Sequence, residues 1–222
     1  MRLIGFESLF CGTVAAVCLF FSDGHAYENG DVQYWNMTQV QKQLTSAWKL
    51  LLNYEARWGG NASELYFHRP EVGLAYQVSD RITLSVNYKY LNSKESGAWK
   101  GASVPHVNAI LNFKWAGLAF MNRHRMEYMG YEDTPHFWRY RGIVYAYLPV
   151  YLPFVKSQPY VGDEVIYHMN ADRLKYHRIY VGLTTKIGAA IKFDAYYLYH
   201  QIRSNDSWSI NHIFGSGLTF AF

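Results

Sequence analysis

RITLSVNYKY, residues 81–90, alternates between two kinds of side chain at every second position. One set is apolar or aromatic: Ile82, Leu84, Val86, Tyr88 and Tyr90. The other set is polar: Arg81, Thr83, Ser85, Asn87 and Lys89. Because successive side chains of a β-strand point to opposite faces, this stretch predicts a strand with one apolar face and one wet face.

The same alternation recurs along most of the chain. It is found at residues 48–58, 65–78, 104–115, 118–128, 137–148, 157–168, 174–186, 189–201 and 208–222, and in a weaker, more polar form at 31–44. Such segments are longer than the roughly 5 or 6 residues usual in soluble strands, and they suit a tilted bilayer crossing of about 9 to 11 residues. The predicted fold is all-β, a transmembrane antiparallel up-and-down β-barrel of 10 to 12 strands. The alternative is a soluble two-layer sandwich with the aromatic face as its core.

Two details of this barrel are open at the level of sequence. Bacterial single-chain barrels have even strand numbers, so residues 31–44 are expected either to cross the lumen of a ten-stranded barrel or to accompany an unrecognised twelfth strand. Pro70 would remove a ladder hydrogen bond and predicts a bulge or a rim position. Short turns near 45, 79, 116 and 187, together with a Pro-bearing link at 149–157, are expected on one rim, and longer loops at 59–64, 92–103, 129–136, 169–173 and 202–207 on the other, as in outer-membrane barrels.

Composition narrows the class of protein. The chain has 222 residues, of which 50% are hydrophobic, 18% aromatic and 17% charged, with a formal net charge of +4. This excludes a disordered chain. Scattered basic residues also argue against nucleic acid as a partner.

The first 26 residues indicate export. Arg2 precedes an apolar stretch at 8–21, and Gly24-His25-Ala26 has the small residues of a cleavage site, so residues 1–26 are predicted to be a signal peptide and 27–222 a single barrel domain. Cys11 and Cys18 both fall in the signal, which excludes disulfides and thiolate chemistry from the mature chain. The expected location is the bacterial outer membrane, with outer-membrane lipids and lipopolysaccharide as partners.

The C-terminal stretch HIFGSGLTFAF, residues 212–222, places four apolar residues on one face: Phe214, Leu218, Phe220 and Phe222. This resembles the terminal strand by which bacterial outer-membrane barrels are recognised by the barrel-assembly machinery. We expect these four residues to form the membrane-insertion signal.

Charged residues gather on the wet faces. If residue 128 pairs with about 138, Glu127 lies opposite Arg139 and Arg125 opposite Arg141. The predicted lumen cluster is Glu71, Arg123, Arg125, Glu127, Arg139, Arg141, Glu164 and Arg178. It predicts either an Arg-rich channel with small, anion-preferring conductance or a salt-bridged plug that holds a structural barrel rigid.

Several short motifs together resemble a family. They are Tyr34-Trp35-Asn36-Met37-Thr38, Trp48-Lys49-Leu50, Arg123-His124-Arg125, Arg139-Tyr140-Arg141, Pro159-Tyr160 with Glu164, and the glycine-rich aromatic last strand. The chain is similar in these to the bacterial outer-membrane barrels grouped as domain of unknown function 2490. The resemblance implies a fold and a location but no activity.

Two alternative functions are weighed. An outer-membrane lipid-modifying hydrolase, of the phospholipase or lipid A deacylase type, would place Ser two residues from its His base, and none of the eight histidines after residue 26 has Ser, Asp or Glu at that spacing. No metal-ligand spacing occurs either, so we expect neither an enzyme nor a cofactor. A surface-loop binding protein would use loops 92–103 and 129–136, with Trp99, Tyr131 and His136 as contacts.

Overall fold

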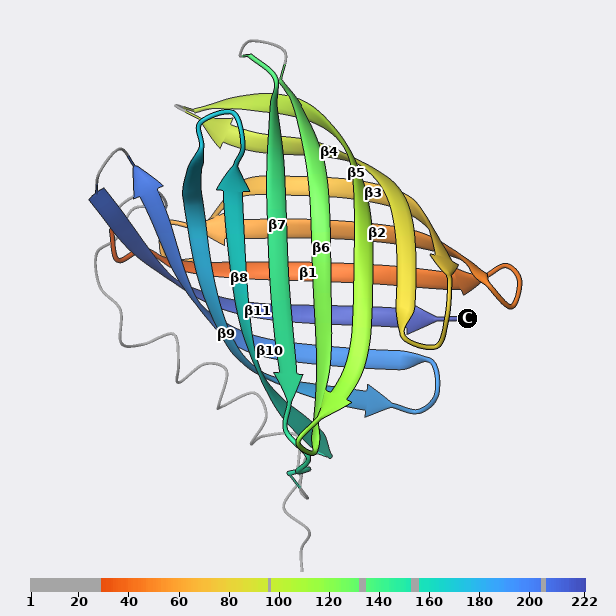
Figure 1. The fold of residues 1–222 in the computed structure, drawn as a ribbon. Helices are drawn as coiled ribbons and strands as arrows, with labels where there is room; N and C mark the ends of the chain where they lie inside the picture. The colour runs from red at the N-terminus through yellow and green to blue at the C-terminus, as the bar shows by residue number, and fades with distance from the viewer. Residues whose placement is uncertain (1–28, 96, 132–134, 153–155, 205–206) are drawn as a thin grey trace, which may run out of the picture.

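The computed structural model describes residues 29–95, 97–131, 135–152, 156–204 and 207–222. The predicted signal peptide 1–26, with both cysteines, lies outside these residues. The described residues are all-β and contain eleven strands (Figure 1). They are β1 (Val32–Gln43), β2 (Trp48–Gly59), β3 (Glu64–Gln77), β4 (Ile82–Glu95), β5 (Ala98–Trp115), β6 (Leu118–Tyr131), β7 (Phe137–Tyr147), β8 (Ser157–His168), β9 (Arg173–Ile187), β10 (Ile191–Ser204) and β11 (Ser207–Ala221).

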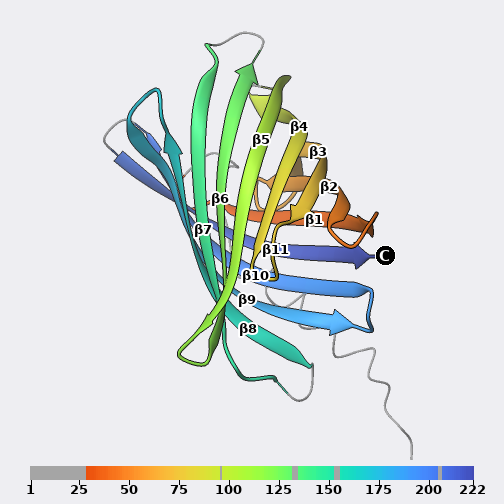
Figure 2. The same cartoon turned by 45° about the vertical axis from the view of Figure 1, so that its right-hand side comes forward.

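The strands form one closed barrel in chain order, and the sandwich alternative is therefore wrong. Consecutive strands pair antiparallel, whereas β1 and β11 close the barrel as a parallel pair running from Val32–His212 to Gln41–Ala221. Figure 1 shows both of these strands pointing the same way beside the C-terminus, and Figure 2 shows the same barrel from a second direction. Residues 31–44 thus neither cross the lumen nor accompany a twelfth strand among the described residues. An odd number of strands closes only if one neighbouring pair is parallel.

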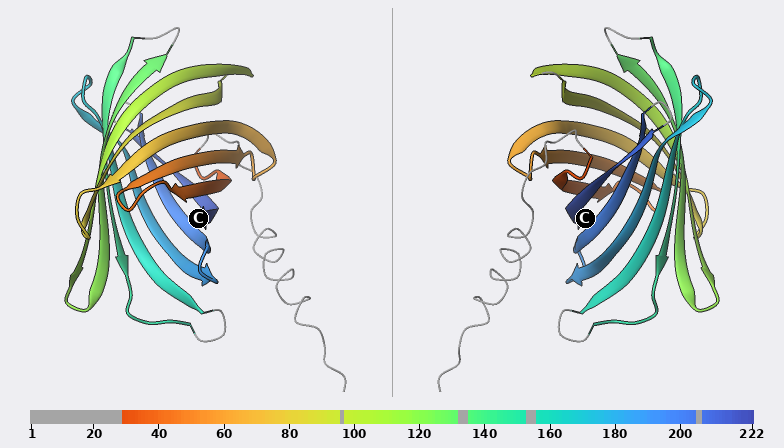
Figure 3. Two further views of the ribbon diagram at one scale, coloured as in Figure 1. Left: turned by 90° about the vertical axis from the view of Figure 1, so that its right-hand side faces the viewer. Right: turned by 90° about the vertical axis from the view of Figure 1, so that its left-hand side faces the viewer.

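The barrel has two rims, which we name after the chain ends. The C-terminal rim, where β11 ends, carries the connections 44–47, 78–81, 116–117, 148–156 and 188–190. The N-terminal rim, where β1 begins, carries 60–63, 96–97, 132–136, 169–172 and 205–206. Figure 3 shows the wall from two opposite sides. The expected contrast in loop length is wrong, because β4 and β5 continue as a hairpin through most of 92–103, and the long link 148–156 is on the other rim.

The two faces of the wall have the polarity predicted from the alternation. Val86, Val107 and Val181 point outward and are 60%, 52% and 55% exposed, whereas Lys89 and Glu127 point inward and are buried. A water-soluble barrel has the opposite arrangement, with apolar side chains inside. Large apolar side chains therefore cover the outside, and the interior is charged.

Strand register follows the prediction closely in β6 and β7, where Glu127 pairs with Arg139 and Arg125 with Arg141.

Pro70 lies neither at a bulge nor at a rim, contrary to the prediction. It lies on the outer face in mid-strand, and the register on both sides of it is unchanged, although its pair with β4 is missing. The bulge in this hairpin lies instead at Arg57/Trp58.

Candidate functional site

Glu127 on β6 is the first of two carboxylates around which the interior charges gather. Its side chain is fully buried. Oε2 accepts a hydrogen bond from Nε of Arg139 at 2.6 Å. Oε1 is contacted by Nζ of Lys89 and, at 3.5 Å, by Nη1 of Arg125. A carboxylate in this position stays charged only because several cations compensate its lost hydration.

Glu164 on β8 is the second carboxylate. Its Oε1 accepts from Nη2 of Arg141 at 2.7 Å, and its Oε2 accepts from Nη1 of Arg178 at 3.0 Å and from the Tyr180 hydroxyl at 3.1 Å. The other terminal nitrogen of Arg141 lies 3.7 Å from Glu127. Arg141 therefore joins the two carboxylates into one network.

A third group of charges lies on β2 and β3. Arg69 places Nη2 at 2.5 Å from Glu55 and Nη1 at 2.6 Å from Glu71, and Arg57 donates from Nε to Glu55 at 2.6 Å. All four side chains are largely buried. Arg69 thus links two carboxylates here as Arg141 does on the other side.

Two asparagines connect this group to the first. Asn87 donates to Glu71 at 3.4 Å, Asn108 donates to Asn87 at 3.0 Å, and Arg125 donates from Nε to Asn108 at 2.6 Å. The bonds cross β3, β4, β5 and β6 on the inner face of the wall. The interior polar groups therefore form one continuous layer.

The structure brings all eight residues of the predicted cluster into this layer, with Arg123 the most peripheral at 3.6 Å from Glu164. We define the charged layer as Glu55, Arg57, Arg69, Glu71, Lys89, Arg123, Arg125, Glu127, Arg139, Arg141, Glu164 and Arg178. The prediction missed Glu55, Arg57, Arg69 and Lys89. Three of these already stand on wet faces in the alternation of 48–58 and 81–90, so that signal was present.

An apolar layer packs between the charged layer and the N-terminal rim along β3 to β7. Leu91, Ala102, Val104 and Met129 are buried there, and the rings of Phe67, Tyr131 and Phe137 pack against them. The interior along these five strands is therefore filled with side chains on the N-terminal side of the charged layer.

A cavity of about 410 Å³ occupies the other half of the lumen. The charged layer forms its floor, and its lining extends to Gln41, Lys49 and Lys192 near the strand ends at the C-terminal rim. We call this cavity the vestibule. One side of it is aromatic, formed by Tyr145, Tyr147, Tyr160, Tyr180 and Tyr196.

The tyrosine wall rests on glycines of the neighbouring strands. Gly215 on β11 lies beneath the Tyr196 ring, and an added Cβ at this glycine would overlap that ring. Tyr160 covers Gly182 in the same way, with its ring 2.5 Å from where a Cβ would be. Tyr145 covers Gly162. Glycine therefore allows each ring to lie flat against the backbone of the next strand.

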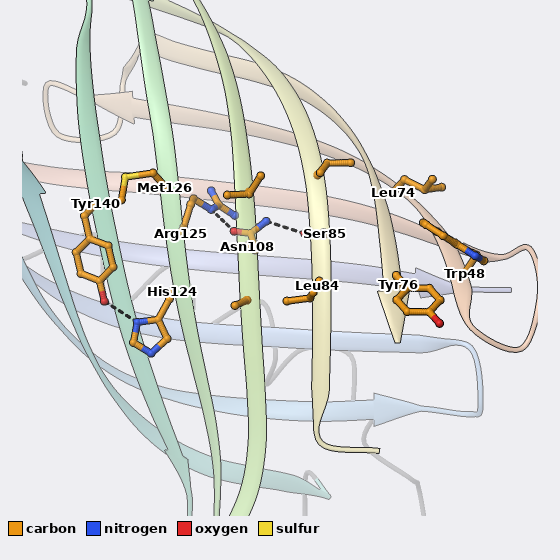
Figure 4. Close-up of a pocket in the computed structure, with 13 residues that line it drawn as sticks. Trp48, Leu74, Tyr76, Leu84, Ser85, Asn108, His124, Arg125, Met126 and Tyr140 are labelled. Atoms are coloured by element: carbon orange, nitrogen blue, oxygen red, sulfur yellow. Dashed lines mark hydrogen bonds between the residues drawn. The ribbon is translucent and has the colours of Figure 1, made fainter. Parts of the chain in front are cut away.

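The outer wall also has a depression, of about 550 Å³, across β2 to β7. Figure 4 shows it lined by apolar side chains such as Leu74 and Leu84, with Trp48 at one end and the hydrogen-bonded pair His124 and Tyr140 at the other. The His124 Nδ1 and Tyr140 hydroxyl are 2.6 Å apart. The shape and lining fit flexible hydrocarbon rather than a polar ligand.

The remaining predicted residues are placed as follows. Phe214, Leu218 and Phe220 lie on the outer face of β11 beside β1, and Phe222 follows the strand and is exposed. Trp99 belongs to the β4–β5 hairpin rather than to a loop.

Tyr131 packs inside the barrel against the apolar layer. His136 hydrogen bonds the Tyr128 hydroxyl at 2.8 Å. Of the two loops expected to carry surface contacts, 92–103 is thus largely strand, and 129–131 are the end of β6.

One polar constellation on the outer face was not visible in the sequence. His177 on β9 contacts Asp163 of β8 through Nε2 at 3.1 Å and Gln201 of β10 through Nδ1 at 2.9 Å. The partners of the two ring nitrogens are a carboxylate and an amide oxygen, so neither nitrogen is bonded to a hydroxyl or thiol that could serve as a nucleophile. Within the described ranges no group of three or more His, Cys, Asp or Glu is placed to hold a metal ion.

Fold and site together define an all-β closed barrel with an apolar exterior, a charged interior layer and a vestibule at one end. Residues 32–211 match the family model described as protein of unknown function (DUF2490), and the chain belongs to that family. No curated protein and no solved structure matched the chain. Among the described residues, no helix is long and apolar enough to span a membrane.

Proposed function

We propose that this protein is an integral β-barrel of the bacterial outer membrane whose lumen is closed to solutes, so that it is a plugged barrel rather than an open channel. The observation that carries the proposal is the inverted polarity of the wall. Aliphatic side chains such as Val86 and Val181 are more than half exposed outside, while Glu127 and Glu164 are fully buried inside. Hydrocarbon is the surroundings in which such an exterior is stable.

The closure follows from how the interior is filled. The charged layer crosses the lumen with hydrogen bonds and ion pairs of 2.6–3.7 Å around Glu127 and Glu164, and the apolar layer lies directly beyond it. Of the two predictions left open by the sequence, the salt-bridged plug therefore has more support than the anion-preferring channel.

Two measurements test this. After carbonate extraction of membranes from a Gram-negative host, the protein should stay in the pellet and, unheated, should migrate faster on a gel than after boiling. Purified protein reconstituted in a planar bilayer should give no stable conductance. A water-soluble monomer obtained without detergent would contradict the membrane location, and long-lived ohmic steps from wild-type protein would contradict the closed lumen.

The hydrolase alternative gains little from the structure. Asp163, His177 and Gln201 do lie together on the outer wall, at a depth where lipid would reach them. However, each nitrogen of the imidazole is already bonded to an oxygen. We therefore retain the prediction that the protein is not an enzyme.

A further inference from the structure

We propose that the vestibule binds a small organic anion that combines one carboxylate or phosphate group with a flat, weakly polar body. This deepens the proposed function, because it takes the vestibule to be the accessible end of a lumen closed at its other end. The cavity, about 410 Å³, falls within the roughly 300–1,000 Å³ of ordinary ligand sites.

Charge is the first argument for an anion. Eight cationic side chains line the vestibule against three anionic ones, an excess of five positive charges. The cations are Lys49, Arg57, Arg69, Arg123, Arg125, Arg141, Arg178 and Lys192, and the anions are Glu55, Glu164 and Asp194. In a partly enclosed space of low dielectric, such an excess attracts a counter-ion much more strongly than on an open surface.

Arg123 is the residue placed to receive the anionic group. Glu164 is already bonded to Arg141 and Arg178, and Arg123 reaches it only at 3.6 Å. The Arg123 side chain is 23% exposed in the lining of the vestibule, although its Nε is buried and has no hydrogen-bond partner. The donors available to an anion are therefore the terminal nitrogens of its guanidinium, which fit a carboxylate or phosphate in two-point geometry.

The tyrosine wall argues for a flat body. Tyr145 and Tyr160 meet edge to face, with ring centroids 5.4 Å apart, and Tyr180 and Tyr196 lie 5.6 Å apart. The glycines beneath Tyr145, Tyr160 and Tyr196 hold these rings against the wall rather than across the cavity. Tyr160 and Tyr180 are themselves buried, whereas Tyr145, Tyr147 and Tyr196 are partly exposed, and these three rings offer stacking surfaces at little cost in side-chain entropy.

Calorimetric titration of the detergent-solubilised full chain tests the proposal. The probe is 4-hydroxybenzoate, compared with 4-hydroxybenzamide, which has the same flat body without charge, and with inorganic phosphate, which has charge without the body. We expect the benzoate to bind at least about tenfold more tightly than either comparison compound, as expected for a charged hydrogen bond. Equal heats for benzoate and benzamide would indicate uptake by detergent and would overturn the proposal.

Three variants locate the site. Arg123→Gln should weaken benzoate binding at least about tenfold, and it leaves Glu164 with Arg141 and Arg178. Met37→Trp should abolish binding by filling space, since Met37 lines the cavity and is 37% exposed.

Lys42→Gln, which removes a charge from the exposed outer side of β1, is the matched control and should bind normally. Binding unaffected by both cavity variants would overturn the proposal. If the protein is membrane-embedded and non-conducting but binds none of the three probes, the anion site is wrong and the proposed function stands. If the protein conducts ions, only the proposed closure of the lumen is wrong.

Discussion

Arg141 shows at the scale of one residue why the interior is stable although it is charged. A single buried arginine would be very costly, but Arg141 lies 2.7 Å from Glu164 and 3.7 Å from Glu127. Each of these carboxylates has further cations around it. Removing Arg141 would leave both carboxylates with fewer cations in a buried network, and breaking a buried ion pair typically costs about 3–5 kcal/mol.

Two glycines of β11 give a matched test of the tyrosine wall. Gly215→Ala should destabilise the folded barrel by about 1–3 kcal/mol, the usual cost of overpacking, because the new methyl group overlaps the Tyr196 ring. At Gly217, on the same inner face, an added Cβ would meet Asp194 at 3.5 Å and the Met37 carbonyl oxygen at 3.9 Å, both ordinary contact distances, so Gly217→Ala should change stability little. Urea unfolding in lipid vesicles, followed by tryptophan fluorescence, measures both. Equal effects of the two substitutions would contradict the proposed role of Gly215.

At the scale of the element, the outer face of β4 offers a test of whether the barrel lies in lipid. Ile82 begins the strand at the C-terminal rim, and Val86 lies four residues further in. Both are exposed, Val86 the more so. In water, substituting an exposed valine usually changes the free energy of unfolding little. In a bilayer, the destabilisation caused by a charged side chain depends on its depth.

This difference yields a prediction. Val86→Lys should cost about 2–4 kcal/mol in a bilayer, and Ile82→Lys only about 0–1 kcal/mol, because lysine near the interface reaches water. The free energies of unfolding of both variants, measured in phosphatidylcholine vesicles, test this difference. If the two substitutions are equally harmless, β4 does not lie in hydrocarbon.

Sequence alone locates the eleven strands well, since period-two alternation persists wherever the two faces of a strand differ in polarity. It fails for the outer part of the β4–β5 hairpin, where Asn92, Ser93 and Lys94 are polar on both faces and so resemble a loop. It gives the cross-strand pairs of β6 and β7, because a hairpin is local. The link from Lys89 to Glu127 joins β4 to β6, which are not neighbouring strands, so it depends on the curvature of the wall, which no local pattern encodes.

At the scale of the whole molecule, the parallel seam between β1 and β11 determines where the chain ends lie. Val32 pairs with His212 and Gln41 with Ala221, so β1 begins at one rim and β11 ends at the other. An even number of crossings would place both ends on one side. We propose that the C-terminal rim faces the periplasm, in which case β1 begins at the cell surface and the vestibule opens toward the periplasm.

Protease accessibility in a Gram-negative host tests this arrangement. A protease site inserted directly before Asn29 should be cut by enzyme added to intact cells, whereas a site after Phe222 should be cut only once the outer membrane is permeabilised. Sites inserted in the connections 60–63 and 78–81 are matched controls, because they lie on the N-terminal and C-terminal rims respectively. Cleavage of both terminal sites under the same condition, with the two controls still distinguished, would mean that β1 does not close the barrel in parallel with β11 in the membrane.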